Sequence, residues 1–220
     1  MSIRIVIADD HRILREGIAR MLADRPEFEI VGEAENGHDA IAQVGRLLPD
    51  VILMDVSMPE LNGVDAVARL RRLAPRTAVL AMSMHVDHSV VKRMLAAGAN
   101  GYLIKGCGLD ELCEALTVTA QGRMYLSPEL PQDAQDALQE SLDDPRRGNG
   151  RIRGALSPRE REVLQLLSEG KPTKVIASKL GLSTKTVENH RKQVREKLDL
   201  HSTAELTKYA IREGLTDLGR

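Results

Sequence analysis

The first half of the chain alternates between short apolar runs and longer stretches in which apolar residues recur with a helical period. The five short runs have the length of strands and cover residues 4–8, 29–34, 51–55, 77–83 and 101–105. The stretches between them carry apolar stripes, such as Leu14, Ile18 and Leu22. Five strands alternating with five helices predict an α/β fold, a doubly wound five-stranded parallel sheet with helices on both faces.

The pattern changes near residue 126, where Pro, Gly and paired Asp residues replace the apolar runs. This composition predicts a polar linker over residues 126–153, with a short helix around 134–142, between domains at 1–125 and 154–220. An irregular extension of the first domain is the alternative interpretation of the same segment.

The last segment carries the start and stop signals of four short helices. Ser157 to Glu160 has the form of a capping box, and a second one runs from Ser202 to Glu205. Between them, Gly181 ends a short helix and Ser183 begins one that reaches about Leu198. We therefore expect a small, all-α, four-helix domain after the sheet domain.

Composition restricts the class of protein. Of the 220 residues, 42% are hydrophobic, which is enough for packed cores. The two cysteines, Cys107 and Cys113, are too few for a disulfide scaffold and are typical of a reducing compartment. The chain starts directly on a strand-like run, and no stretch approaches the roughly 18 apolar residues of a membrane span. We expect a cytoplasmic protein that does not interact with membranes.

The charge is unevenly distributed. Residues 151–220 carry 15 Lys and Arg against 9 Asp and Glu, a net of +6, although the whole chain has a net charge of -1. A basic C-terminal block after an acidic body favours nucleic acid as a partner of the last domain.

Polar residues follow the predicted strands where their carboxyl ends meet at one edge of the sheet. Asp9 and Asp10 end the first strand, Asp55 the third, Ser83 the fourth and Lys105 the fifth. Converging carboxylates require a cation, and their oxygen atoms suit Mg²⁺. The lysine and the serine would then face an anion such as a phosphoryl group, which an aspartate can accept as an acyl phosphate. A single aspartate there is usually only a turn former, so the prediction depends on the combination.

Residues 1–120 resemble the receiver (CheY-like) domain of two-component response regulators. The resemblance is carried by Asp9-Asp10, by Asp55 with Met58-Pro59 and Gly63, by Ser83, and by Tyr102 and Lys105. It implies that Asp55 is the phosphoacceptor. It also implies that Asp10, Asp55 and the backbone carbonyl of Ser57 bind Mg²⁺, with Asp9 in the outer shell.

The same resemblance assigns the switch. Ser83 would donate a hydrogen bond to the phosphoryl group, Lys105 would pair with it, and Tyr102 would turn inward when Ser83 moves. The surface that changes would extend from about Asp87 to Thr119. Gly106 follows Lys105 where many receivers have proline, so the cis bond before that proline is not expected.

The third predicted helix of the last domain has two faces. Val187, Val194 and Leu198 form an apolar stripe, while polar and basic residues lie opposite and along the flank. A solvated amphipathic helix is the alternative, but Ala177, Gly181 and Val187 have the spacing of a helix-turn-helix core.

Residues 155–216 resemble the LuxR-type helix-turn-helix domain, through segments 156–164, 176–177, 180–183 and 186–190. The order of the two domains resembles the NarL/FixJ subfamily of response regulators. By this resemblance Glu188, Asn189 and Lys192 face base edges. Phosphate contacts would come from Thr173, Lys174, Lys185, Arg191 and Arg195. Thr173 and Val175 depart from the family pattern, and the acidic Glu188 should alter sequence preference, through cytosine contacts or simple repulsion.

The fourth predicted helix, residues 203–213, resembles the dimerisation helix through Leu206, Tyr209 and Ala210. Packing of this apolar face within its own domain is the alternative. A two-fold dimer would bind paired half-sites on DNA.

These features predict a DNA-binding response regulator rather than an enzyme. Its partners would be a histidine kinase, promoter DNA and, when phosphorylated, a second copy of the chain; before phosphorylation the receiver is expected to obstruct the third helix. One rival is a phosphohydrolase of the haloacid-dehalogenase type. Such enzymes usually have a second acid two residues after the nucleophile, but two residues after Asp55 this chain has Ser57. The other rival is a transcription factor whose receiver works without phosphorylation.

Overall fold

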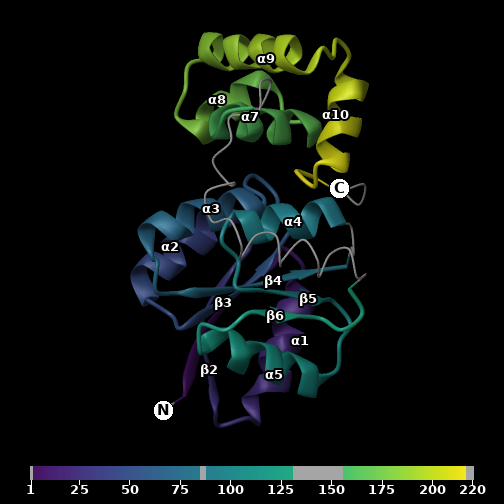
Figure 1. Ribbon diagram of the computed structural model, residues 1–220. Helices are drawn as coiled ribbons and strands as arrows, with labels where there is room; N and C mark the ends of the chain where they lie inside the picture. The colour runs from purple at the N-terminus through teal and green to yellow at the C-terminus, as the bar shows by residue number, and fades with distance from the viewer. Residues whose placement is uncertain (1, 85–87, 131–155, 217–220) are drawn as a thin grey trace.

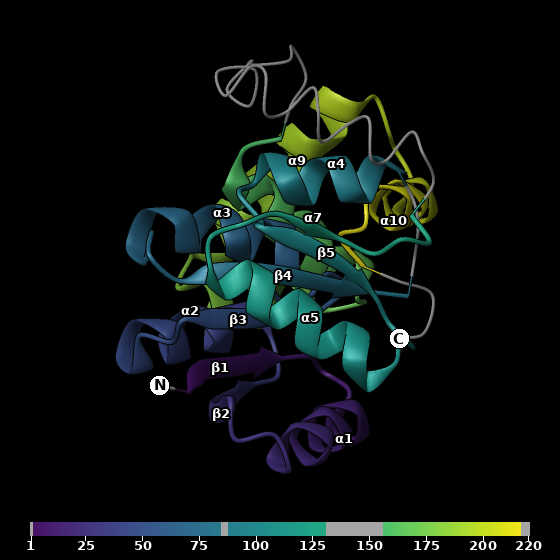
Figure 2. The same cartoon turned by 60° about the horizontal axis from the view of Figure 1, so that its bottom comes forward.

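A computed structural model describes residues 2–84, 88–130 and 156–216 (Figure 1). The N-terminal domain is one parallel sheet of six strands in the order β2-β1-β3-β4-β5-β6. Figure 2 shows β2, β1, β3, β4 and β5 in this order. The strands are β1 (Ile3–Ala8), β2 (Phe28–Ala34), β3 (Val51–Asp55), β4 (Ala78–Ser83), β5 (Gly101–Ile104) and β6 (Tyr125–Leu126). The doubly wound α/β fold predicted from the sequence is confirmed.

Five helices cover the two faces of this sheet. They are α1 (Arg12–Ala23), α2 (Gly37–Leu47), α3 (Gly63–Leu73), α4 (His88–Ala96) and α5 (Leu109–Ala120). In Figure 1, α2, α3 and α4 lie above the sheet, and α1 and α5 lie below it. Alternate residues of β1 explain this arrangement, because Val6 joins the core under α2–α4 whereas Ile5 and Ile7 join the core over α1 and α5.

The sixth strand is a difference from the sequence-based expectation of five. Gly101 of β5 pairs with Tyr125 of β6. Leu130, further along the chain, is buried in the same domain. The segment that begins the predicted linker at 126 therefore starts as part of the sheet domain. Its two-residue strand is too short to give a periodic pattern. The rest of the predicted linker, and the predicted helix at 134–142, lie outside the described residues.

The C-terminal domain contains α7 (Pro158–Ser168), α8 (Thr173–Leu180), α9 (Thr184–Leu198) and α10 (Thr203–Arg212). Both predicted capping boxes are formed, at Ser157 and at Ser202, and Ser183 caps α9 by accepting a hydrogen bond from the Thr186 amide. Gly181 ends α8 with a φ of 62°, in the left-handed region that favours glycine. The four predicted helices are thus present.

Candidate functional site

Two carboxylates lie side by side at the carboxyl ends of β1 and β3. The register of these neighbouring parallel strands pairs Ala8 with Met54, so the residues that follow, Asp9 and Asp55, come together. Asp9 is 0% exposed and Asp55 is 3% exposed. Two buried acids require compensation of their charge, because desolvation and mutual repulsion both disfavour the ionised forms.

Lys105 supplies part of that compensation. It follows β5, and its Nζ lies 2.7 Å from Asp9 Oδ2 and 3.0 Å from Asp55 Oδ1. Burial raises the pKa of Asp55 to about 7; Lys105 opposes this shift and Asp9 adds to it. Burial alone lowers the pKa of Lys105, but the two carboxylates outweigh it and the pKa is raised. The lysine is therefore held as a cation between two acids.

The donor atoms fit a divalent cation. One ligand atom from each of Asp9, Asp10, His11 and Asp55 lies within 4.8 Å of the others. Carboxylate oxygens are hard ligands of the kind that Mg²⁺ prefers, and Asp10 is only partly buried, which leaves access for water ligands. His11 was not predicted from the sequence; its Nδ1 lies 3.2 Å from Asp9 and 3.1 Å from Asp10.

The loop between β3 and α3 is tightly folded around Asp55. The Ser57 amide donates a hydrogen bond to the Asp55 carboxylate, and the Gly63 amide donates to Val56 O at 2.8 Å. A Cβ at Gly63 would lie 2.2 Å from the carbonyl oxygen of Asp55. The glycine that follows Asp55 at this spacing is thus required for the loop to return this closely to the strand end.

The two predicted switch residues lie in the same half of the sheet domain. Ser83 ends β4 and is buried, near the strand ends of the acidic site. The Tyr102 ring is 0% exposed and belongs to the core under α2–α4. Tyr102 was predicted to turn inward when Ser83 moves. The ring packs among the buried side chains of this core, and its movement with Ser83 stays a prediction.

Arg15 is a further residue at this site that sequence reasoning missed. Its Nη1 donates a hydrogen bond of 2.5 Å to Asp9 O, and its Nε lies 3.1 Å from Glu33 Oε2. With Ile18 and Leu22 it forms the buried face of α1. An arginine at an apolar position of the helical period was the signal that could have identified it, since a buried guanidinium needs acceptors.

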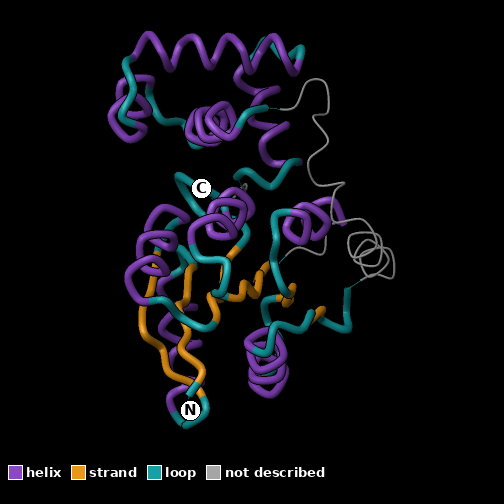
Figure 3. Tube along the Cα trace, turned by 60° about the vertical axis from the view of Figure 1, so that its left-hand side comes forward, coloured by secondary structure: helices purple, strands orange, loops and turns teal. Residues whose placement is uncertain are grey.

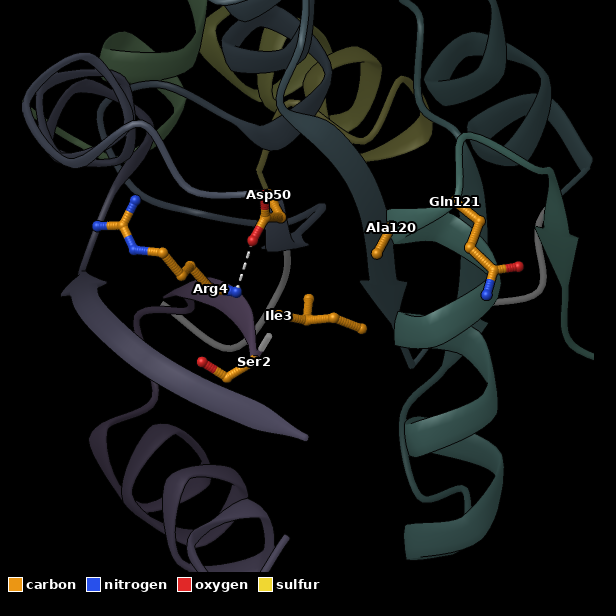
Figure 4. A pocket seen from close by; sticks show the side chains of 6 residues that line it. All are labelled: Ser2, Ile3, Arg4, Asp50, Ala120 and Gln121. Atoms are coloured by element: carbon orange, nitrogen blue, oxygen red, sulfur yellow. Dashed lines mark hydrogen bonds between the residues drawn. The ribbon is translucent and has the colours of Figure 1, made fainter. Parts of the chain in front are cut away.

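The opposite edge of the sheet holds a shallow hollow of about 620 Å³ (Figure 4). It is lined by Ser2, Ile3, Arg4, Asp50, Ala120 and Gln121. Asp50 there accepts a hydrogen bond of 2.8 Å from the Arg4 amide, so its carboxylate serves the backbone of β1. Because this edge carries the amino ends of β1 and β3, the hollow is separate from the acidic cluster.

The helix α9 displays its polar face to solvent. Val187 and Val194 are buried, and the three predicted base-facing residues, Glu188, Asn189 and Lys192, are exposed. Among the predicted phosphate contacts, Lys174 and Lys185 are exposed, whereas Thr173, Arg191 and Arg195 are half-buried. The Nε atoms of Arg191 and Arg195 have no hydrogen-bond partner in the described part of the chain.

The position of α9 contradicts one expectation. We expected the receiver to obstruct this helix, but α9 lies on the side of the C-terminal domain that faces away from the sheet domain (Figures 1 and 3). The side that faces the sheet domain is formed by α7, α8 and the end of α10. Polar side chains of α7 have partners on the receiver, and the receiver does not cover the opposite face of the C-terminal domain.

Ion pairs and hydrogen bonds join the two domains. Arg161 Nη2 lies 2.5 Å from Asp65 Oδ1, and Lys179 Nζ lies 2.6 Å from Glu60 Oε1. Arg93 of α4 donates a hydrogen bond to the Glu213 carbonyl. Most of these contacts are on α3 and on the loop before it, whereas only Arg93 belongs to the segment that we expected to change, from about Asp87 to Thr119. Residues 85–87 lie outside the description.

The three predicted dimerisation residues pack within their own domain. Leu206 is 2% exposed and Ala210 is 0% exposed, and Tyr209 packs against the same core. This is the alternative that the sequence left open: the apolar face of α10 is turned toward α7 and α9. In this arrangement the Leu206 and Ala210 side chains are not available to a second copy of the chain, whereas Tyr209 is half-buried.

Within the part of the chain that the structure describes, no helix combines the length and the apolar character that crossing a bilayer requires. Cys107 and Cys113 are both unpaired and half-buried, as expected for packing residues.

Comparisons with known proteins agree with this architecture. Residues 5–117 match the response regulator receiver domain family, and residues 154–210 match the luxR family of bacterial regulatory proteins. The chain is 38% identical to the response regulator GacA of Pseudomonas protegens, over 98% of both chains. It is 37% identical to the transcriptional regulatory protein DegU of Brevibacillus brevis, over 97% of this chain and 94% of DegU. A solved structure of the Salmonella typhimurium RcsB response regulator, described for its DNA interaction, superimposes with a TM-score of 0.63 and 26% identity, covering 96% of this chain and 98% of that one.

Proposed function

Because the chain belongs to the response regulators that join a receiver domain to a LuxR-family regulatory domain, we propose that phosphorylation of Asp55 controls its binding to promoter DNA. This family consists of transcriptional regulators, so the receiver is a switch rather than a metabolic enzyme. The observation that carries the proposal is the position of Lys105 Nζ within 3.0 Å of both Asp9 and Asp55.

The phosphoryl group comes from a phosphohistidine of the cognate kinase or from a small donor such as acetyl phosphate. Asp55 Oδ attacks the phosphorus, an O–P bond forms, and the donor's P–N or P–O bond breaks with its electron pair leaving on the donor. Later attack of water on the acyl phosphate releases phosphate and regenerates the carboxylate. The first step requires Asp55 as a carboxylate, and because burial raises the pKa of Asp55, neighbouring cations such as Lys105 favour that form.

Asp10, Asp55 and the Ser57 carbonyl would hold Mg²⁺, and Asp9 would act from the outer shell. When bound, this ion neutralises the carboxylates and the phosphoryl oxygens. Lys105 can move from its pairs with Asp9 and Asp55 to a phosphoryl oxygen, and the Ser83 hydroxyl can donate to another. Arg15 keeps the Asp9 backbone in place while these contacts exchange.

The C-terminal domain would place α9 in the major groove, with Glu188, Asn189 and Lys192 toward the bases. Lys174, Lys185, Arg191 and Arg195 would bind phosphates, and Thr173 would approach the backbone near them. Exposure of this face on the side away from the receiver supports the proposal. Glu188 is acidic, so at its base position we expect a preference for cytosine, whose N4 amine can donate to a carboxylate.

A phosphorylated homodimer is part of the proposal, since paired half-sites need a two-fold protein. Its interface must use surfaces other than Leu206 and Ala210, which would otherwise have to leave the core. Action in the cytoplasm follows from the partners, a kinase and promoter DNA, and the two unpaired cysteines support it.

The test is the intact mass of the protein after incubation with acetyl phosphate, with and without Mg²⁺. A gain of one phosphoryl group that requires Mg²⁺ and is lost in Asp55→Asn is the expected result. DNA binding of both proteins is then measured with and without the donor. No gain with any donor, together with unchanged DNA binding, would move the protein to the regulators whose receivers work without phosphorylation.

A further inference from the structure

The C-terminal domain contacts the loop that leaves the phosphoacceptor strand. Residues 56–62 connect β3, which ends at Asp55, to α3. Gln165 of helix α7 and Glu169, the residue after its end, bind this loop, which lies more than 100 residues away in sequence. Figure 1 shows the two helices α7 and α3 facing each other across the domain boundary. The contact therefore lies next to the proposed site of phosphorylation.

Gln165 is the centre of this contact. Its side chain is 0% exposed although it lies on the helix face turned toward another domain. Its Nε2 donates a hydrogen bond of 2.8 Å to Met58 O, and its Oε1 accepts from the Asn62 amide at 3.0 Å and from Asn62 Nδ2 at 3.1 Å. A single side chain of the C-terminal domain thus satisfies three polar groups of the receiver loop, which would be costly to bury unpaired.

Glu60, in the middle of the loop, is held by the same domain. Its backbone has a φ of 67°, which is disfavoured for a residue with a side chain. Its amide donates a 3.0 Å hydrogen bond to Glu169 Oε1, and its carboxylate accepts one of 2.6 Å from Lys179 Nζ. The Glu169 carboxylate in turn accepts from Gln165 Nε2 at 3.0 Å. These contacts stabilise a loop conformation that the receiver sequence alone disfavours.

The other end of the same loop touches the phosphoacceptor. The Ser57 amide is hydrogen-bonded to the Asp55 carboxylate, and the Ser57 carbonyl is the backbone ligand assigned to Mg²⁺ in the proposed function. Met58, whose carbonyl is bound by Gln165, is the next residue. The Ser57 carbonyl belongs to the peptide bond that joins Ser57 to Met58. A change in the position of Met58 therefore also moves this proposed ligand.

We propose that Gln165 is a positioning residue for phosphoryl transfer to Asp55: through Met58 and Asn62 it fixes the loop that carries the Mg²⁺-binding carbonyl. The DNA-binding domain then completes the phosphorylation site of the receiver. The coupling is reciprocal, since a loop arrangement that favours the cation also favours docking of α7 by the same factor. This inference rests on the proposed function of Asp55.

The test compares Gln165→Ala with Arg161→Ala in the full-length protein. Both remove one α7 side chain from the domain contact, but the partner of Arg161 across that contact is Asp65 of α3, after the loop. Affinity for the cation is measured without a phosphodonor, by electron paramagnetic resonance of Mn²⁺. Phosphorylation rates with acetyl phosphate are measured over a range of Mg²⁺ concentrations.

For Gln165→Ala we expect Mn²⁺ affinity to fall about threefold to tenfold, since partners of metal ligands commonly have effects of this size or larger. The Mg²⁺ concentration for half-maximal rate should rise in parallel, while the rate at saturating Mg²⁺ changes less than twofold. Arg161→Ala should stay within twofold of wild type in both. Equal losses in the two variants, or no loss in either, would overturn the inference.

Hydrogen exchange followed by NMR gives a check that does not depend on the cation. In wild type the Asn62 amide should be protected, and Gln165→Ala should increase its exchange while strand β4 keeps its protection. An unprotected Asn62 amide in wild type would show that the contact is not formed and would overturn the inference. Failure of the proposed function gives a different result from failure of this inference. If the proposed function is wrong, Asp55→Asn would leave Mn²⁺ binding unchanged.

Discussion

The ammonium of Lys105 lies 3.0 Å from the Asp55 carboxylate and 2.7 Å from Asp9, with all three side chains almost completely buried. The positive charge of Lys105 compensates the negative charges of these two acids, which are 46 residues apart in sequence. It also defines where an incoming anion must compete for the lysine.

Removing this cation should slow phosphorylation. For Lys105→Ala we expect the initial rate with acetyl phosphate and Mg²⁺ to fall about tenfold to a hundredfold, because the charge that forms on the phosphoryl oxygens loses its counter-charge. Quantitative intact-mass measurements give the rate, and Lys105→Arg, which keeps the charge, should retain more of it. Equal rates in Lys105→Ala and wild type would contradict this role.

The burial of Tyr102 gives a prediction for stability. Tyr102→Ala should lower the free energy of unfolding of the receiver by about 3–5 kcal/mol, as expected when a buried aromatic ring is deleted. Urea unfolding followed by circular dichroism measures this loss, and Tyr102→Phe, which keeps the ring, should lose much less. A loss below about 1 kcal/mol in Tyr102→Ala would mean that the ring lies outside the core in solution.

Two glycines provide a matched pair of substitutions. Gly63→Ala places a Cβ 2.2 Å from the Asp55 carbonyl oxygen and should destabilise the receiver by about 1–3 kcal/mol. Gly45→Ala, within α2 and with no atom near its added Cβ, should instead stabilise by up to about 1 kcal/mol. Thermal unfolding of the two variants should therefore shift in opposite directions, and a shift in the same direction would contradict the close approach at Gly63.

Glu160 gives a prediction for pH. Burial raises its pKa, but the hydrogen bonds from Lys197 and the Ser157 amide outweigh burial, so the pKa is lowered from its usual value near 4.5. A lowered folded-state pKa means that Glu160 stabilises the C-terminal domain above about pH 4.5 and that this contribution is lost as pH falls through the folded-state pKa. Glu160→Gln should cost about 1 kcal/mol at pH 7.

The measurement is thermal unfolding followed by far-ultraviolet circular dichroism at several pH values. The difference between Glu160→Gln and wild type should decrease below pH 4.5. A difference that is the same at pH 7 and pH 3.5 would indicate packing rather than charge as its cause.

The residues of α8 and α9 should differ in what they contribute to DNA binding. Asn189→Ala should weaken binding to a selected operator by about 1–3 kcal/mol and leave binding to random DNA unchanged. Lys174→Ala should weaken both and reduce the slope of log K against log salt by about 1. Fluorescence anisotropy at several salt concentrations tests both, and equal loss on both DNAs for Asn189→Ala would argue against base contact.

The sequence predicted the elements that depend on local pattern. The strands and helices follow from hydrophobic period and caps, and Asp9, Asp55, Ser83 and Lys105 meet because parallel strands end at one edge of a sheet. The short β6 was missed because two residues have no measurable period. Arg15 was missed because its partner Glu33 comes from another strand, and His11 was missed because only folding brings Asp55 close to it.

The sequence by itself thus determined the fold of each domain, the acidic site and the polar face of α9. Only the tertiary structure decided how the parts face one another: Tyr102 lies inside the core, Leu206 and Ala210 face their own domain, and Gln165 reaches the loop after Asp55. The physical reason is that periodicity defines which face of an element is buried. The partner of that face depends on packing and hydrogen bonding between residues that are far apart in the chain.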